Sequence, residues 1–90
     1  MIELTEAIDA KRIISFTYKA KKRKAEVYAL GVSKAGSLVC RCYEIPVGGF
    51  KLFLVDEMKD VTLENRRWYF SRSGYNRNGD ASMVEVLRQI

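Results

Sequence analysis

Residues 30–58 read LGVSKAGSLVCRCYEIPVGGFKLFLVDEM and have the pattern of three consecutive β-strands. A turn at Lys34–Gly36 and a loop at Pro46–Gly49 separate these strands. Short connections that contain glycine are typical of antiparallel hairpins, so this stretch predicts strands that each turn back on the one before. The predicted strands are Leu30–Ser33, Ser37–Tyr43 and Phe50–Val55.

The middle strand has two chemically different faces, because side chains alternate along a strand. One face carries leucine and both cysteines, and we expect it to face the core. The other face places a cation beside an aromatic ring, which is where a ligand would sit. The residues expected to face the core are Leu38, Cys40 and Cys42, and the residues of the other face are Val39, Arg41 and Tyr43.

The remaining segments complete a small β-rich domain. Leu4, Ala7 and Ile8 form the apolar stripe of a short N-terminal helix, which we expect to act as a lid over the sheet. Further strands are predicted at Ile13–Tyr18 and at Lys59–Glu64. The segment Glu26–Leu30 continues directly into Leu30–Ser33, so these two segments form one strand. Five short strands with tight turns predict a small, strongly bent antiparallel barrel, since closure removes exposed edges.

Length and composition set the broad class of the protein. The chain has 90 residues and a net charge of +5, which predicts a single domain over residues 1–90 with a small core. Its apolar runs are shorter than the roughly 20 residues of a membrane span. Residues 1–12 also carry acids where a secretory signal has a basic segment followed by an apolar one. We therefore expect a cytoplasmic domain with no membrane contact.

The cysteines and the lack of histidine restrict the possible chemistry. Cys40 and Cys42 are the only cysteines, and positions two apart on one strand suit a disulfide poorly. Two thiols are too few for a structural zinc site. Histidine, the commonest general base, does not occur in the chain. We expect two buried thiols, no catalytic residue, no metal and no cofactor, and therefore a protein that is not an enzyme.

Two stretches are rich in cations and contain no acid. Lys11–Lys24 carries seven positive charges, five of them in the predicted hairpin tip Lys19–Lys24. Asn65–Gly79 interleaves four arginines with four aromatic residues. Arginine and aromatic side chains contact phosphates and stack on unpaired bases, so both stretches are candidate nucleic-acid contacts.

Each basic stretch also has a purely structural interpretation. In that interpretation the hairpin tip of the first stretch is only a solvated loop. In the second stretch, Trp68 and Phe70 cover an open end of the barrel and the nearby arginines are solvated. Residues 82–90 fit either a short helix or a strand, and their apolar side chains predict docking onto the core or onto a second subunit.

A series of motifs follows one another along nearly the whole chain. They are Ala7-Ile8, Ile14-x-Phe16-x-Tyr18, Leu30-Gly31, Gly36, Val39–Tyr43, the glycine loop, Lys51–Met58, Ser73–Asn76, Gly79-Asp80 and Met83. In this order they resemble the WYL domain, particularly the short single-domain versions of bacteria and phages. The resemblance implies an Sm/SH3-like five-stranded barrel. It also implies a sensing module of transcription regulators or defence-associated proteins that binds nucleic acids or nucleotide-like ligands.

The chain departs from the family pattern at two places. Ser37-Leu38-Val39 stands where the family has its Trp-Tyr-Leu signature. Leu54 and Glu57 stand where the family has two arginines. Arg41 and Tyr43 keep a charged and aromatic pair on the middle strand.

We therefore predict a module that binds single-stranded nucleic acid, or a nucleotide-like phosphorylated ligand, through a basic and aromatic surface. The alternative is a protein-interaction module, such as an accessory subunit or a phage-type inhibitor, that uses a barrel edge or the C-terminal segment with a protein partner or in a homo-oligomer. The predicted ligand contacts are Arg41, Tyr43, Lys51, Arg66, Arg67, Trp68, Arg72, Lys21, Lys22 and Arg23.

Overall fold

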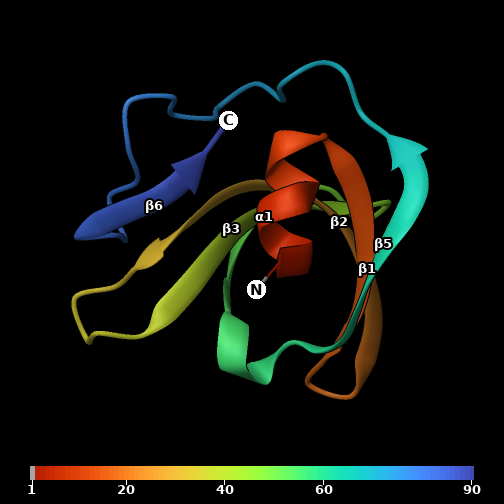
Figure 1. The fold of residues 1–90 in the computed structure, drawn as a ribbon, viewed down its shortest axis with the longest axis horizontal. Helices are drawn as coiled ribbons and strands as arrows, with labels where there is room; N and C mark the ends of the chain where they lie inside the picture. Colours follow the sequence, from red (N-terminus) through yellow and green to blue (C-terminus); the bar gives the residue numbers. More distant parts are fainter. Residues whose placement is uncertain (1) are drawn as a thin grey trace.

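The computed structural model describes residues 2–90, which form one short helix and six strands (Figure 1). The elements are α1 (Ile2–Asp9), β1 (Arg12–Tyr18), β2 (Lys21–Val32), β3 (Leu38–Ile45), β4 (Phe50–Leu54), the 3-10 helix η1 (Val55–Glu57), β5 (Lys59–Arg67) and β6 (Glu85–Gln89). Among these residues, no helix has the length and apolar character needed to cross a membrane.

Strand β2 is the centre of the sheet, because it is long enough to pair with three neighbours. One of its edges pairs with β3, and the other pairs first with β1 and then with β6. All pairings are antiparallel, and the strands follow the order β4-β3-β2-β1-β5 with β6 beside β2.

The predicted count of five strands is wrong, and the sixth is β6. Residues 82–90 fitted both a helix and a strand, and long-range pairing decides between them. Strand β2 extends beyond β1, so the backbone groups of Ala29–Val32 need another partner, and β6 supplies it. Strand β5 is also longer than predicted, since it continues to Arg67.

A hydrophobic core lies between α1 and one face of the sheet, which we call the inner face. Leu4, Ala7 and Ile8 of α1 are buried there, as the predicted helix requires. Cys40 and Cys42 are fully buried in the same core, with their Sγ atoms 3.3 Å apart. Burial, together with the hydrogen bond between the two thiols, raises the pKa of the Cys42 thiol well above its ordinary value. Both cysteines are therefore packing residues, as predicted.

The sheet is strongly curved, so that strands three positions apart in its order meet across the core. The Phe53 ring of β4 lies 5.1 Å from the Phe16 ring and 4.8 Å from the Tyr18 ring, both in β1. The Leu54 backbone N–H also donates to the Tyr18 hydroxyl at 3.1 Å. Within residues 2–90 no pairing joins β4 to β5, so the sheet remains open.

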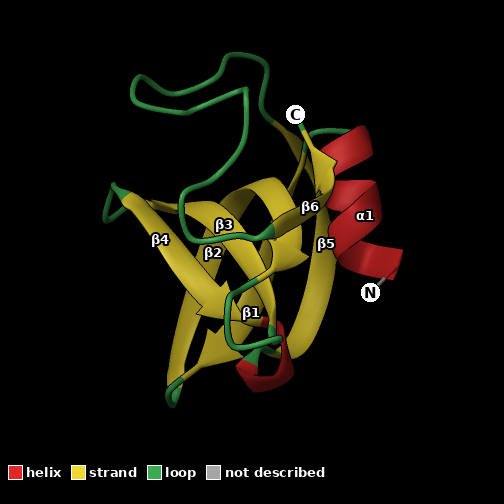
Figure 2. Cartoon of the chain, turned by 90° about the vertical axis from the view of Figure 1, so that its left-hand side faces the viewer, coloured by secondary structure: helices red, strands yellow, loops and turns green. Residues whose placement is uncertain are grey.

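Residues 68–90, the C-terminal segment, cover part of the opposite, outer face of the sheet. Figure 2 shows most of this segment as a long loop that ends in β6. Met83 packs there against Ala29 and Val39, and all three are buried. The parts of β2 and β3 beneath this segment are therefore buried on both faces, although sequence alternation predicts an open second face for β3.

Gly31 allows the C-terminal segment to approach β2. A Cβ atom at this position would come within 2.5 Å of Met83 Sδ and closer still to the carbonyl oxygen of Glu85. The methionine side chain can move away, but the carbonyl belongs to the backbone of β6. Only glycine therefore permits the observed packing of β6 on β2.

We expect Gly31→Ala to lower the free energy of unfolding by about 1–3 kcal/mol, the usual range for overpacking. Urea unfolding measures this loss, and hydrogen exchange should show that the amides of β6 become less protected. The control is Val84→Ala, since Val84 is 63% exposed in the same segment. Unchanged stability and unchanged exchange in Gly31→Ala would contradict this account.

Candidate nucleic-acid interface

Tyr28 on the outer face anchors the C-terminal segment. The register between β2 and β3 shifts between Val27 and Ala29, and this bulge turns Tyr28 and Ala29 to the same face. The Tyr28 hydroxyl donates to Glu26 Oε1 at 3.1 Å and accepts from the Arg72 backbone N–H at 2.9 Å. Its carbonyl oxygen accepts from the Tyr75 hydroxyl and from the Ile90 N–H.

Aromatic rings surround Tyr28 and exclude water from it. Its ring centroid lies 5.0 Å from Phe50, 4.6 Å from Trp68 and 4.7 Å from Tyr75. Burial is the main reason that the pKa of Tyr28 rises to about 12. Trp68 is only 6% exposed, so it packs on the sheet, whereas Phe70 is 87% exposed and covers nothing. Trp68 is therefore buried, as the structural interpretation requires, but on the outer face of an open sheet, and that interpretation fails for Phe70.

Arg72 connects the C-terminal segment to a buried carboxylate. Its guanidinium donates to both carboxylate oxygens of Glu26, at 3.1 and 2.8 Å, and Glu26 is only 3% exposed. The Arg72 guanidinium also lies 4.4 Å from the centroid of the Tyr43 ring. The pairing with Glu26 raises the pKa of Arg72, so this group stays charged. The Arg72 guanidinium is thus fixed over an aromatic ring, and its side chain remains 43% exposed at the surface.

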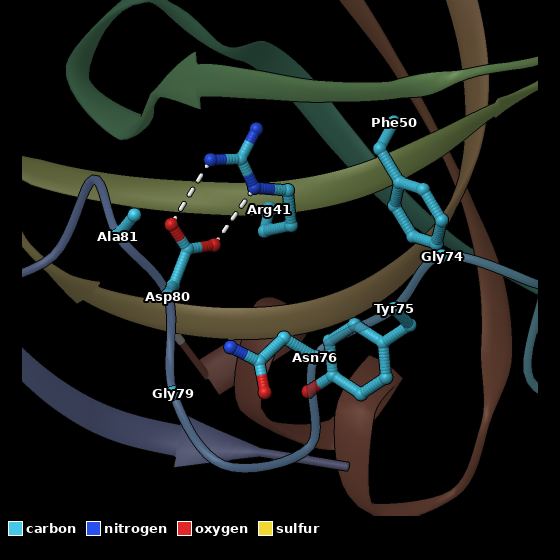
Figure 3. Close-up of a pocket in the computed structure, with 8 residues that line it drawn as sticks. All are labelled: Arg41, Phe50, Gly74, Tyr75, Asn76, Gly79, Asp80 and Ala81. Carbon is cyan, nitrogen blue, oxygen red and sulfur yellow. Dashed lines mark hydrogen bonds and ion pairs between the residues drawn. The ribbon is translucent and has the colours of Figure 1, made fainter.

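Arg41 belongs to a separate pocket of about 260 Å³. In Figure 3, Arg41 and Asp80 lie on one side of this pocket and the rings of Phe50 and Tyr75 on the other. Arg41 donates to both oxygens of Asp80, at 2.8 and 3.0 Å. These hydrogen bonds lower the pKa of Asp80, so the carboxylate stays charged and neutralises Arg41. This pocket has no net positive charge to attract a phosphate.

Two adjoining hollows form a longer groove on the outer face, which we call the basic groove. They share Lys24, Ile45 and Pro46, and they have volumes of about 620 and 540 Å³. Five cations and two acids line the groove. The cations are Lys22, Arg23, Lys24, Arg66 and Arg72, and the acids are Asp60 and Glu64.

Local structure explains why the cations of the hairpin reach this groove. The β1–β2 turn consists of Lys19 and Ala20, both with positive φ, so the basic residues after it already belong to β2. Lys22 and Lys24 therefore point to one side, since strand side chains alternate. Lys24 forms an ion pair with Glu64 at 3.4 Å. Within the described part of the chain, Lys22 and Arg66 form no ion pair or side-chain hydrogen bond.

The structure brings together only some of the predicted contact residues. Lys22, Arg23, Tyr43, Arg66 and Arg72 all line the basic groove.

The other predicted contacts lie elsewhere. Arg41 is held by Asp80, and Lys51 donates to Glu44 at 2.6 Å. Lys21 and Arg67 are exposed outside the groove, and Trp68 is buried. Ligand binding at all of these positions remains a prediction.

Two further features of this surface have weak sequence signals. Lys24 lies in the basic hairpin, and only its alternation with Lys22 marks it as a groove residue. Tyr69 and Phe70 are 73% and 87% exposed, whereas the neighbouring Trp68 is buried. No local sequence pattern predicts this difference among the three aromatic residues. Within residues 2–90, no group of three or more Cys, Asp or Glu side chains is placed to hold a metal ion.

Tyr28 should ionise near pH 12. Its raised pKa means that the folded state prefers the neutral phenol, and the resulting stability is complete below pH 10. This stability is then lost as the pH rises from 10 through 12. Ultraviolet absorbance of tyrosinate should show a late step that disappears in Tyr28→Phe and persists in Tyr69→Phe. Persistence of the step in Tyr28→Phe would assign it to another tyrosine.

Arg72→Ala should destabilise the fold by about 1–3 kcal/mol, because it removes charged hydrogen bonds from a buried carboxylate. Adding Glu26→Gln should recover part of this loss, since the remaining buried group is then neutral. Urea unfolding measures both effects. Arg77→Ala is the matched control, as Arg77 is exposed and its guanidinium donates to the Ser71 hydroxyl rather than to a buried carboxylate. Equal stability of the Arg72 and Arg77 variants would exclude Arg72 as an anchor.

Comparison with protein-family models, with curated proteins and with solved structures finds no match for this chain.

Proposed function

We propose that this protein binds single-stranded nucleic acid, or a phosphorylated nucleotide-like ligand, along the basic groove and catalyses no reaction. The observation that carries this proposal is the arrangement of the groove itself. Lys22, Lys24 and Arg66 line it, and the Tyr43 ring lies beneath the Arg72 guanidinium. Cations in a row attract a phosphate backbone, and an aromatic ring with a stacked arginine suits an unpaired base.

The distribution of acids supports this site over the pocket around Arg41. Asp80 neutralises Arg41, and Glu44 accepts from both Lys51 and Arg23. Glu26 is buried beneath Arg72, whose side chain is still 43% exposed. Lys22 and Arg66 are exposed, and no carboxylate within residues 2–90 pairs with them. The groove is therefore where positive charge remains available to a ligand.

The WYL resemblance and the SH3/Sm-like barrel belong to the same proposal. The contact of Phe53 with Phe16 and Tyr18 supports a barrel-like curvature, since it brings β4 against β1. A WYL-type module would then use its outer face for the ligand, with the C-terminal segment over one part of that face and the basic groove beside it.

A protein-interaction module is the second candidate, and one observation favours it. Strand β4 is at the edge of the sheet, and its Leu52 and Leu54 are 36% and 37% exposed. A strand of a partner, or of a second copy, would add to this edge through backbone hydrogen bonds. The C-terminal strand β6 offers a second such edge, because among the described strands it pairs with β2 alone.

Fluorescence anisotropy with a short labelled single strand, at several salt concentrations, tests the proposed function. We expect saturable binding that weakens as salt rises, because phosphate contacts release counterions. The double variant Lys22→Ala/Arg66→Ala should bind roughly 30-fold more weakly, on an estimate of about 1 kcal/mol for each contact. Its slope of log K against log salt should fall by about 1.4, since each lost contact removes about 0.7.

The control is Lys34→Ala/Arg88→Ala, which removes the same charge outside the groove. This variant should retain most of the affinity. No binding by the wild type, or equal loss in the two double variants, would contradict a site in the basic groove. A partner captured without salt dependence would instead favour the edge of β4.

A further inference from the structure

Tyr69 and Phe70 form the most exposed pair of aromatic neighbours on the described surface. Their exposed fractions are 73% and 87%. They follow the end of β5 at Arg67, and they have no ring contact with each other or with another aromatic side chain in residues 2–90. Burial of these rings against the protein's own core is therefore not what holds them in place.

The backbone on both sides of this pair is firmly anchored. Before it, the Trp68 N–H donates to the Lys11 carbonyl at 2.9 Å, and the Trp68 ring packs against Tyr28. After it, the Arg72 N–H donates to the Tyr28 hydroxyl and the Arg72 guanidinium is held by Glu26. Only Ser71 lies between Phe70 and this second anchor. The two rings are thus presented on a short, fixed span, which lowers the entropy lost when a ligand binds.

The surroundings of the pair select the chemistry of its partner. Arg66 and Arg72 line the basic groove and lie within three residues of Tyr69. At about 3.8 Å between consecutive Cα atoms, the Cα atom of Tyr69 lies within roughly 12 Å of the Cα atoms of both groove arginines. The stretch Asn65–Gly79 contains no acid that would repel an anion. The partner that fits is a polyanion that carries flat apolar groups.

We propose that Tyr69 and Phe70 are stacking platforms for unpaired bases of the single strand whose phosphates lie in the basic groove. This inference rests on the proposed function and adds how the bases, rather than the backbone, are recognised. Stacking on a ring tolerates any base, so the module binds single strands with little sequence preference. Bases inside a duplex are already stacked, so duplexes gain nothing from these rings.

The test compares a labelled oligo(dT) strand with an abasic strand of the same length, which keeps the phosphates and lacks the bases. We expect the wild type to bind oligo(dT) more tightly than the abasic strand. Tyr69→Ala/Phe70→Ala should bind oligo(dT) about 30-fold more weakly, the lower end for two lost stacking contacts. The same variant should bind the abasic strand as the wild type does, with an unchanged salt slope.

Two control variants make the result specific to the rings. Val84→Ala/Leu87→Ala removes two other exposed apolar side chains, which are 63% and 50% exposed in the same segment, and should bind normally. Tyr69→Phe/Phe70→Tyr keeps both rings and should also bind normally. Because Tyr69 and Phe70 are exposed, the alanine variant should unfold at the same urea concentration as the wild type.

The outcomes separate this inference from the proposed function. Equal binding of oligo(dT) and the abasic strand by the wild type, with no effect of Tyr69→Ala/Phe70→Ala, would overturn the stacking platforms and leave groove binding intact. No binding of either strand would overturn both. Salt-dependent binding to phosphatidylserine vesicles without binding to oligo(dT) would reassign the exposed rings to a lipid surface.

Discussion

The outer half of this fold depends on the burial of Tyr28, a residue that faces away from the main core. The bulge in β2 turns the ring outward, and the C-terminal segment then encloses it with Trp68 and Tyr75. A buried hydroxyl must form hydrogen bonds, and here it donates to Glu26 in the same strand and accepts from the backbone N–H of Arg72, 44 residues away. Glu26 is buried as well, and its carboxylate accepts two hydrogen bonds from the Arg72 guanidinium, which fixes that side chain. One residue thus links the sheet, the C-terminal segment and the edge of the basic groove.

This arrangement separates two kinds of arginine on one surface. Arg41 and Arg72 hold the C-terminal segment through bidentate pairs with Asp80 and Glu26. Arg66 forms no ion pair in the described chain and remains available at the groove. Arg72 has both roles, since its guanidinium is anchored on one side and stacked on Tyr43 at the surface. A charged residue near a groove is therefore not evidence of ligand contact until its own partners are known.

Local patterns predicted the parts of this structure that depend on local rules. Alternation placed Cys40 and Cys42 in the core, and the apolar stripe of Leu4, Ala7 and Ile8 identified α1. The same alternation put Arg41 and Tyr43 on the opposite face, but it could not show that this face is covered. The cover comes from residues 39 and 46 positions away, where Asp80 meets Arg41 and Arg72 meets Glu26. Trp68 and β6 were ambiguous for the same reason, because only a long-range partner determines their place.

The division of β2 between two neighbours has a consequence for how the chain folds during synthesis. Strands β1 to β3 can pair as soon as they are made, whereas the last four residues of β2, Ala29–Val32, pair on their second edge with β6, which is synthesised much later. Until then Ala29–Val32 exposes unpaired backbone groups beside apolar side chains, a template for joining another chain. Contacts between such distant segments also form slowly, because a long loop must close first. Misassembly of nascent chains should therefore concentrate at this edge of β2, which β6 covers in the folded protein.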